Sequence, residues 1–184
     1  MNISKKETVL NQDISKYIQM YLPSIKSGNS HHFFIITDIY ESSLTNQIYN
    51  FIENNYPMFM LQLTNIEDID KLCIQILEEI SPEKFKNIGL NSSKKEFRHI
   101  KDNLAFYLSD LTKNIEGLII IIDDINQLTR TPEFANWYKS FADTLVTSIE
   151  NTPIGIIFIG TSKDFNRIYK HNPSVTRIFH TITC

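Results

Sequence analysis

The chain has 184 residues, 42% of them apolar, with 18 lysines and arginines against 21 aspartates and glutamates. This length and composition are typical of one globular domain, and a net charge of −3 gives no general attraction to nucleic acid or anionic membranes. No aliphatic run reaches the roughly 20 residues that span a bilayer, and the first residues lack the apolar segment of a signal peptide. We therefore expect a single domain over residues 1–184, located in the cytoplasm.

Apolar periodicity predicts helices and strands that alternate along the chain. In chain order, the patterns predict a helix over 7–26, a strand over 32–37, a helix over 43–55, a strand over 58–63, helices over 66–80 and from 93 toward 114, a strand within 117–124, a helix after 131, a strand over 154–160, a helix over 163–169 and a strand over 178–182. Thr64 with Glu67, and Ser93 with Glu96, have the spacing of helix capping boxes. This alternation predicts a mainly parallel sheet between two layers of helices.

The most informative stretch is residues 117–124, which read Gly-Leu-Ile-Ile-Ile-Ile-Asp-Asp. An aliphatic run without alternation predicts a strand buried on both faces, and in open α/β sheets ligands bind at the carboxyl ends of such strands. Asp123 and Asp124 are the kind of acid pair that a magnesium-dependent nucleotide hydrolase uses, one for the metal shell and one to orient water. Strand-end aspartates also cap turns, so this alternative stays open.

Four residue runs occur in a fixed order along the chain, and their resemblance to a known family covers nearly all of it. They are residues 118–124, 134–137, 156–161 and 172–179. Together they resemble the core of P-loop ATPases of the AAA+ and STAND kind, close to bacterial relatives of origin-recognition ATPases. The resemblance implies a three-layer αβα P-loop NTPase fold with a mainly parallel five-stranded sheet in the order 5-1-4-3-2.

The resemblance also implies a role for individual residues. Asp123 resembles the Walker B residue that binds magnesium, and Asp124 resembles the acid that orients the attacking water. Thr161 looks like the polar sensor that contacts the γ-phosphate, and Arg177 is similar in placement to an arginine that reads nucleotide state, sometimes across a subunit boundary. The alternatives are a helix cap for Thr161 and a solvated or salt-bridged surface position for Arg177.

The same alignment puts the phosphate-binding loop at residues 38–45, where the expected pattern is Gly, four residues, Gly, Lys, then Ser or Thr. Asp38 and Ser43 replace the two glycines, and Leu44 replaces the lysine. The glycines matter because backbone N–H groups must wrap closely around a phosphate in conformations that a Cβ disfavours. The lysine matters because one charge pair at about 4 Å contributes roughly 4 kcal/mol at an effective dielectric of about 20.

The remaining loop residues also weaken the case for a nucleotide. The acids at positions 38 and 41 add negative charge where a triphosphate would lie. Ser42 or Ser43 can instead cap the following helix, using the N–H groups that a phosphate would occupy. Thr45 keeps the hydroxyl that would share magnesium with Asp123, but only if Mg-ATP binds.

These departures predict a degenerate ATPase-like domain, a pseudoenzyme with impaired or absent ATP binding and no bound cofactor, which acts as an interaction or regulatory module. We expect a protein partner or an oligomer, and no membrane contact. The alternative is a functional ATPase that binds Mg-ATP through a non-standard loop or through residues supplied in trans. A further expected departure concerns the helical lid into which family members continue past the fifth strand. This sequence stops at Cys184, either because it is a fragment or because it is a shortened relative.

Two other interpretations, a nucleic-acid motor and a histidine metal site, have less support from the residues. The acidic balance argues against a nucleic-acid motor or origin-binding fragment. His31 and His32 are neighbours on a predicted strand and should point to opposite faces, so they cannot easily share a metal ion. Cys73 lies within an amphipathic helical pattern and is expected in the core.

Overall fold

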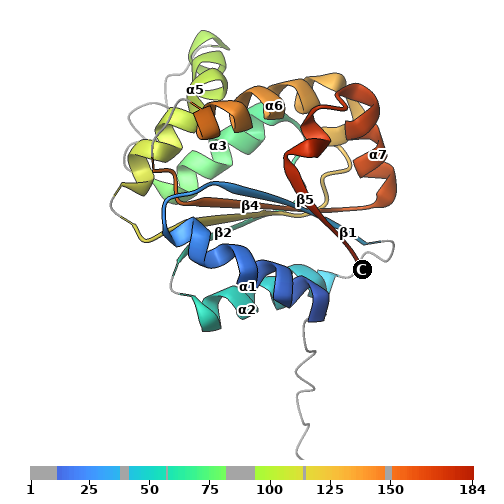
Figure 1. Cartoon of the computed structure of the whole chain (residues 1–184). Helices are drawn as coiled ribbons and strands as arrows, with labels where there is room; N and C mark the ends of the chain where they lie inside the picture. Colours follow the sequence, from blue (N-terminus) through green and yellow to red (C-terminus); the bar gives the residue numbers. More distant parts are fainter. Residues whose placement is uncertain (1–11, 38–41, 57, 82–93, 114, 148–150) are drawn as a thin grey trace, which may run out of the picture.

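Five parallel strands form one sheet that lies between two layers of helices (Figure 1). The computed structural model describes residues 12–37, 42–56, 58–81, 94–113, 115–147 and 151–184, with all their side chains except those of 42 and 94–98. The strands are β1 (His31–Ile36), β2 (Phe59–Leu63), β3 (Leu118–Ile122), β4 (Ile154–Gly160) and β5 (Phe179–Thr183). The helices are α1 (Gln12–Lys26), α2 (Ser42–Asn55), α3 (Ile69–Ile80), α5 (Lys94–Thr112), α6 (Pro132–Thr147) and α7 (Ser162–His171), with short 3-10 helices η1 (Leu128–Arg130) and η2 (Val175–Arg177).

The strand order is β2-β3-β4-β1-β5, and every neighbouring pair is parallel. Read from the other edge, this is the predicted order 5-1-4-3-2, which is therefore confirmed. In the centre of the sheet, Ile120 pairs with Leu61 of β2 on one side and with Ile156 of β4 on the other. All residues of β3 and β4 are buried because helices cover both faces, and this explains why their sequences are aliphatic without alternation.

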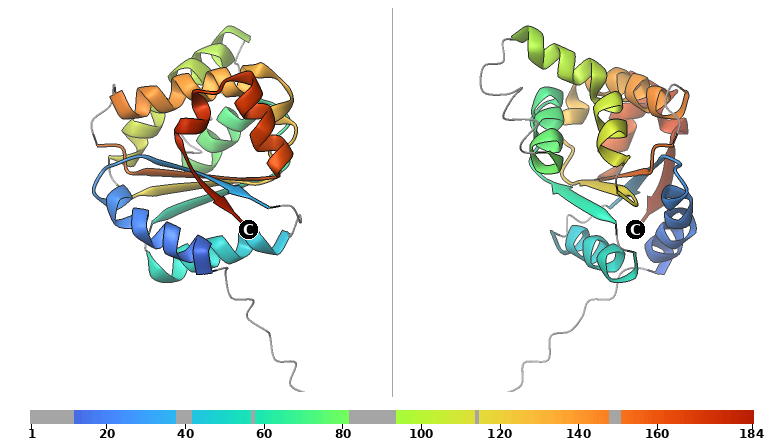
Figure 2. Two further views of the ribbon diagram at one scale, coloured as in Figure 1. Left: turned by 45° about the vertical axis from the view of Figure 1, so that its right-hand side comes forward. Right: turned by 90° about the vertical axis from the view of Figure 1, so that its left-hand side faces the viewer.

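The two helical layers differ in size (Figures 1 and 2). Helices α1 and α2 cover one face of the sheet, and α3, α5, α6 and α7 cover the other. Helix α1 buries a stripe at helical spacing, made of Ile14, Ile18, Leu22 and Ile25. Within the described ranges, no helix is both long and apolar enough to cross a bilayer.

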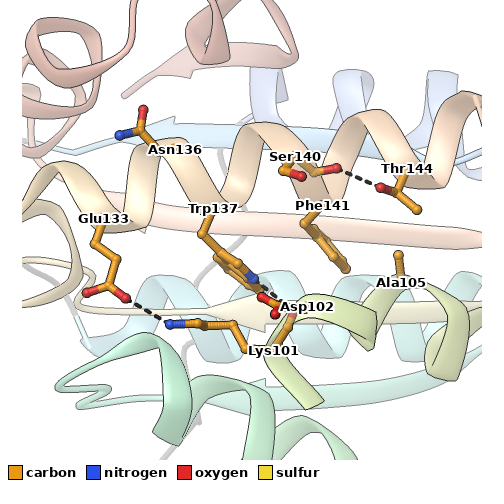
Figure 3. A pocket seen from close by; sticks show the side chains of 9 residues that line it. All are labelled: Lys101, Asp102, Ala105, Glu133, Asn136, Trp137, Ser140, Phe141 and Thr144. Carbon is orange, nitrogen blue, oxygen red and sulfur yellow. Dashed lines mark hydrogen bonds and ion pairs between the residues drawn. The ribbon is translucent and has the colours of Figure 1, made fainter. Parts of the chain in front are cut away.

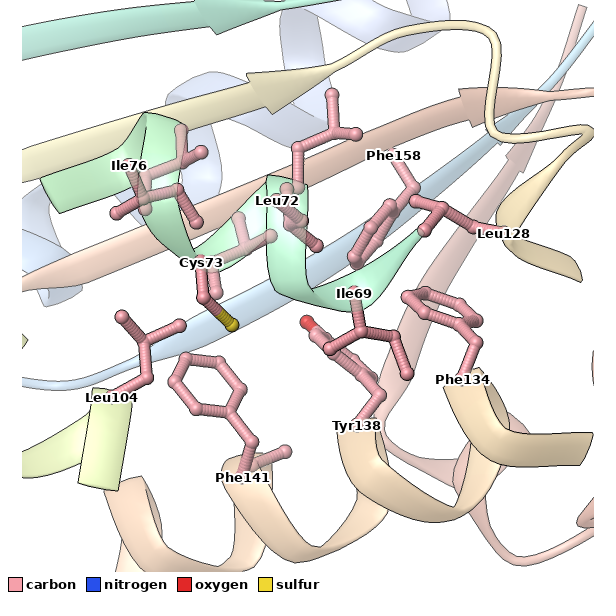
Figure 4. Packing of buried hydrophobic residues seen from close by; sticks show 14 of the residues in the cluster. Ile69, Leu72, Cys73, Ile76, Leu104, Leu128, Phe134, Tyr138, Phe141 and Phe158 are labelled. Atoms are coloured by element: carbon pink, nitrogen blue, oxygen red, sulfur yellow. The ribbon is translucent and has the colours of Figure 1, made fainter. Parts of the chain in front are cut away.

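Aromatic side chains fill the core beneath the larger helical layer (Figure 4). Tyr138 of α6 stacks against Phe134, and its ring meets Phe158 of β4 edge-on with centroids 4.9 Å apart. Cys73 of α3 is buried in the same cluster, which confirms its predicted place in the core. Burial raises the pKa of the Cys73 thiol, so this sulfur stays protonated and chemically quiet.

The two adjacent histidines of β1 point to opposite faces of the sheet, as predicted. His31 Nδ1 lies 3.3 Å from His180 Nε2 under α1, whereas His32 Nδ1 lies 2.5 Å from the hydroxyl of Tyr138. Burial, and then the nearby His31 and His180, lower the pKa of His32 to about 3. No group of three or more metal-ligating side chains occurs among the described residues.

The predicted start of the third helix is wrong by three residues. Helix α3 begins at Ile69, and its cap is Asp68, whose carboxylate accepts a hydrogen bond of 2.8 Å from the backbone N–H of Lys71. Thr64 and Glu67 therefore form no capping box. The preceding Asn65 has a φ of 56°, a left-handed conformation that separates β2 from the helix. The second predicted cap, at Ser93, lies outside the described residues.

Candidate functional site

Thr45 and Asp123 meet at the carboxyl-terminal edge of the sheet, although 78 residues separate them in sequence. Thr45 lies in the first turn of α2, which follows β1, and Asp123 follows the last residue of β3. The hydroxyl Oγ1 of Thr45 donates a hydrogen bond of 2.5 Å to Asp123 Oδ2. The structure thus brings together the two oxygen groups predicted as magnesium ligands, and oxygen is the ligand atom that Mg²⁺ prefers.

The carboxylate of Asp123 is held from two sides. Its second oxygen, Oδ1, accepts a hydrogen bond of 2.8 Å from the backbone N–H of Asp124. Thr45 is 1% exposed and Asp123 is 6% exposed, so the pair lies in a region where an unpartnered charge would be costly. Both carboxylate oxygens of Asp123 therefore have a donor that the protein itself supplies.

Asp124 has an unusual backbone at the end of β3. Its φ is 50°, in the left-handed region that residues with a Cβ rarely adopt and that is often found at functional sites. Its half-buried side chain lines a cavity of about 240 Å³ between the ends of β3 and β4. The cavity is lined by Asp124, Asn126, Gly160, Thr161, Lys163 and Asp164. Two of the predicted catalytic residues, Asp124 and Thr161, therefore share one cavity.

Thr161 is the N-cap of α7. Its hydroxyl donates a hydrogen bond of 2.7 Å to Asp164 Oδ2. The same oxygen accepts a second hydrogen bond, of 3.0 Å, from the backbone N–H of Thr161. The backbone N–H of Asp164 in turn lies 3.3 Å from the Thr161 hydroxyl, which completes a capping box. The structure thus gives Thr161 a capping role, and its sensor role stays a prediction.

Asp164 is the centre of a polar network that the sequence analysis missed. Its carboxylate is 4% exposed, and its Oδ1 accepts from Thr129 over 3.1 Å and from Arg167 over 3.4 Å. Arg167 also donates to Asn126 Oδ1 over 2.8 Å. The spacing of Thr161 and Asp164 was a usable signal for the cap, but Asn126 and Arg167 are 41 residues apart and gave none. Lys163 was missed for the same reason, since only the folded chain shows that it lines the cavity.

Of the predicted phosphate loop at residues 38–45, the structure describes only the part that lies within α2. Leu44 is 8% exposed and packs against the α1 side of the sheet in one cluster with Ile48 and Ile52. Ser43 is exposed on α2. Asp38 and the side chain of Ser42 lie outside the description. Their predicted roles in nucleotide binding stay predictions.

Arg177 lies apart from the cavity residues. It ends η2, is exposed, and does not line the cavity at the ends of β3 and β4. Within the described part of the chain it forms no ion pair or hydrogen bond through its side chain. Its predicted role as a reader of nucleotide state therefore has no geometric support from this single chain.

A larger cavity of about 490 Å³ lies between α5 and α6 (Figure 3). Its walls include Trp137 and Phe141, whose rings stack with centroids 5.3 Å apart. At one end, Lys101 forms ion pairs with Glu133 over 2.8 Å and with Asp70 over 3.5 Å, and these carboxylates raise its pKa. None of the predicted site residues lines this cavity, so the strand-end cavity is the candidate site.

Comparisons with known proteins place the fold. No protein-family model matches the sequence, and no curated protein matches it significantly. Among solved structures, the ORC2 protein of Aeropyrum pernix in its ADP form is similar, with a TM-score of 0.62 and 13% identity over 96% of this chain and 50% of that chain. The Walker-type ATPase paby2304 of Pyrococcus abyssi gives a TM-score of 0.57 and 14% identity over 97% of this chain and 54% of that chain.

A third similar structure is Drosophila ORC bound to DNA, with a TM-score of 0.54 and 10% identity over 94% of this chain and 90% of that chain. The chain spans about half the length of the two archaeal structures. At these identities the likeness establishes the fold alone. The fold is that of an AAA+ or P-loop ATPase-like domain, as the resemblance in sequence implied.

Proposed function

We propose that this chain is a degenerate AAA+/STAND ATPase-like domain in which ATP binding is impaired or absent, and that it acts as an interaction or regulatory module. The observation that carries the proposal is the position of Leu44. It occupies the place of the phosphate-binding lysine in the aligned pattern, and its side chain is buried on the α1 side of the sheet.

The helical spacing of α2 explains why Leu44 is apolar. Leu44, Ile48 and Ile52 follow each other at intervals of four residues and form the stripe that packs α2 against the sheet. Because Leu44 carries no charge, a triphosphate would lack the ion pair with the usual lysine. That ion pair contributes roughly 4 kcal/mol, which corresponds to about a thousandfold in affinity. In the aligned loop sequence, Asp38 and Glu41 add negative charge, which opposes a polyanion.

The residues present fit a divalent cation better than they fit a triphosphate. Thr45 and Asp123 supply a hydroxyl and a carboxylate in direct contact, which would hold Mg²⁺ if a nucleotide completed its shell. With no cation at position 44, nothing among the described residues of α2 meets the β- and γ-phosphates. This half-preserved site supports descent from an ATPase and weak or absent nucleotide binding now.

Isothermal titration calorimetry with Mg-ATP tests the proposal directly. We expect no measurable heat of binding at protein concentrations that detect a dissociation constant in the micromolar range. A micromolar dissociation constant that is lost in Asp123→Asn would overturn the proposal. Heat that persists unchanged in Asp123→Asn would also contradict impaired ATP binding by the chain, and would assign that binding to another site.

A second candidate function is a working ATPase, and one observation favours it. Lys163 brings a positive charge to the cavity that Asp124 and Thr161 line, and a lysine here could meet a phosphate in place of the lost one. Phosphate release that disappears in Asp124→Asn and weakens in Lys163→Gln would support this function. Absence of ATP turnover at every protein concentration would argue against a working ATPase. It would also argue against an ATPase in which another subunit supplies the missing residues.

The proposed interaction role has support from a similar solved structure that belongs to a complex. It is described as Drosophila ORC bound to GC-rich DNA and Cdc6, and it matches 94% of this chain at a TM-score of 0.53 and 11% identity. That protein therefore works within an assembly. For this chain, a protein partner or an oligomer is a proposal.

A further inference from the structure

The lysines and arginines of the described side chains fall into a paired set and an unpaired set. Six form ion pairs with carboxylates, namely Lys26, Lys71, Lys101, Lys113, Lys139 and Arg167. In the larger helical layer and the 3-10 helices beside it, four of the described cations are exposed and form none, namely Arg130, Lys163, Lys170 and Arg177. Lys16 on α1 is the one other unpaired lysine or arginine among the described side chains.

The four unpaired cations come from neighbouring elements. Arg130 ends η1, Lys163 and Lys170 lie on α7, and Arg177 ends η2; both η1 and η2 pack against α7. Lys163 and Lys170 are seven residues apart, about two helical turns, so they project from the same side of α7. We refer to these four residues as the basic face. Helix α7, which carries two of them, lies in the larger helical layer and contacts β1 and β4 (Figure 1).

Acidic side chains within these elements do not neutralise the basic face. The one acid on α7 is Asp164, which is buried and already accepts hydrogen bonds from Thr129, Thr161 and Arg167. The chain as a whole carries a net charge of −3, so the basic face is opposite in sign to the rest of the molecule. Such segregation of charge is a common device for steering a partner of opposite charge.

A large aromatic side chain is exposed on the same helix, about a quarter of a turn around the axis from Lys170. Tyr169, adjacent to Lys170 on α7, is 56% exposed. Tyrosine and arginine are enriched among the residues that contribute most to binding at protein interfaces. The basic face therefore combines long-range attraction for carboxylates with a site for apolar contact.

We propose that the basic face binds an acidic segment of a partner protein, with carboxylates paired to Lys163 and Lys170 and an apolar side chain packed on Tyr169. The proposal rests on the interaction role inferred above, but not on the state of the nucleotide site. A protein is favoured over a nucleic acid because the basic face offers only four cations. Nucleic-acid affinity grows with the number of phosphates neutralised, whereas Tyr169 provides the apolar anchor of a protein interface.

The test is a binding titration of the whole chain with a fluorescently labelled glutamate-rich peptide that contains one leucine. The test variant is Lys163→Gln with Lys170→Gln. The matched control, Lys16→Gln with Lys26→Gln on α1, removes the same charge from the opposite helical layer. We expect about a tenfold loss of affinity in the test variant, little change in the control and steady weakening with added salt. Tyr169→Ser should weaken binding without changing its salt dependence.

Three outcomes would overturn the proposal. The first is no binding of the peptide at low salt, and the second is an equal loss of affinity in the test and control variants. The third is tighter binding of duplex DNA than of the peptide, lost in the same test variant, which would assign the basic face to nucleic acid. Calorimetry with Mg-ATP decides the nucleotide site separately, so failure of either claim can be told from failure of the other.

Discussion

The hydroxyl of Thr45 has a measurable structural role, because it donates to a charged and buried oxygen. Hydrogen bonds to charged groups are stronger than those between neutral groups, and removing the donor leaves the acceptor without compensation. Among the described residues, Thr45 alone donates a hydrogen bond to Asp123 Oδ2, so the burial of this oxygen depends on Thr45. The same pair would hold magnesium in an active relative, and here it also ties α2 to the end of β3.

Thr45→Val should lower the free energy of unfolding by about 1.5–3 kcal/mol, because valine keeps the shape and removes the donor. Urea denaturation of the nucleotide-free protein measures this. Thr152→Val is the matched control, since Thr152 is also buried but donates to a neutral carbonyl, that of Leu145, over 3.3 Å. Thr152→Val should lower the free energy of unfolding by less than Thr45→Val does. An unchanged midpoint for Thr45→Val would mean that the bond to Asp123 contributes nothing to folding.

His32 should make the protein less stable as the pH falls. Its pKa is lowered from 6.5 to about 3 in the fold, so the unfolded chain binds a proton that the folded chain refuses. Above pH 6.5, His32 is neutral in both states and does not change the free energy of unfolding. Between pH 6.5 and pH 3, this free energy falls with decreasing pH, with a slope of up to about 1.4 kcal/mol per pH unit. His32→Gln keeps an acceptor for Tyr138 and removes the titration.

Urea denaturation of both proteins at several pH values checks the effect of His32. The two stability curves should run parallel above the ordinary histidine pKa and converge below it. His31 and His180 have pKa values lowered mainly by burial and contribute with the same sign in both proteins, so they cancel in the difference. Curves that stay parallel at all pH values would contradict the lowered pKa of His32.

At the scale of elements, α7 depends on its cap. Thr161→Ala should reduce stability by about 1 kcal/mol, since it removes the N-cap hydroxyl and one donor to Asp164. Ser140→Ala, at an exposed position of α6, provides the control and should have almost no effect. Thermal unfolding without nucleotide gives the comparison. Equal stability of both variants would mean that the Thr161 cap does not stabilise the fold.

The errors of the sequence analysis also lie at the scale of elements. Thr64 and Glu67 have the correct spacing for a cap, yet Asp68 takes that role because the chain turns at Asn65 before the helix starts. Local patterns cannot decide between two nearby caps when tertiary packing sets where the helix begins. Leu44 was interpreted only as a missing lysine, although its spacing from Ile48 already marked it as a core residue of α2.

At the scale of the whole molecule, the fold was predictable because each level of the sequence agreed. The isoleucines of β3 require cover on both faces of the sheet, and the helices between the strands supply that cover. The shared edge of Thr45 and Asp123 followed from the rule for parallel strand ends. The network of Asp164, Arg167 and Asn126 could not be foreseen, because it depends on how η1 and α7 pack.

Restoring the phosphate loop should recover nucleotide binding if the defect is local. Asp38→Gly, Ser43→Gly and Leu44→Lys together should raise ATP affinity by at least about tenfold, because they restore loop shape and charge. The gain will come with a loss of stability, since Leu44→Lys removes an apolar side chain from the α1 side of the core at a cost of about 2 kcal/mol.

Calorimetry and denaturation of the triple variant measure affinity and stability. The double variant Asp38→Gly with Ser43→Gly is the control that restores shape without charge, and it should gain less. A triple variant that remains folded and binds ATP no better than the parent chain would show that the defect extends beyond this loop.

Trp137 is the only tryptophan of the chain, and its position gives the molecule an intrinsic optical probe. Its indole Nε1 donates to the carbonyl oxygen of Lys101 over 3.1 Å, and so joins α6 to α5 (Figure 3). If α5 separates from α6, the indole loses this acceptor and meets water, which shifts its fluorescence emission to the red. Any ligand or partner that loosens or tightens this junction can therefore be followed in unlabelled protein, by the colour of the light it emits.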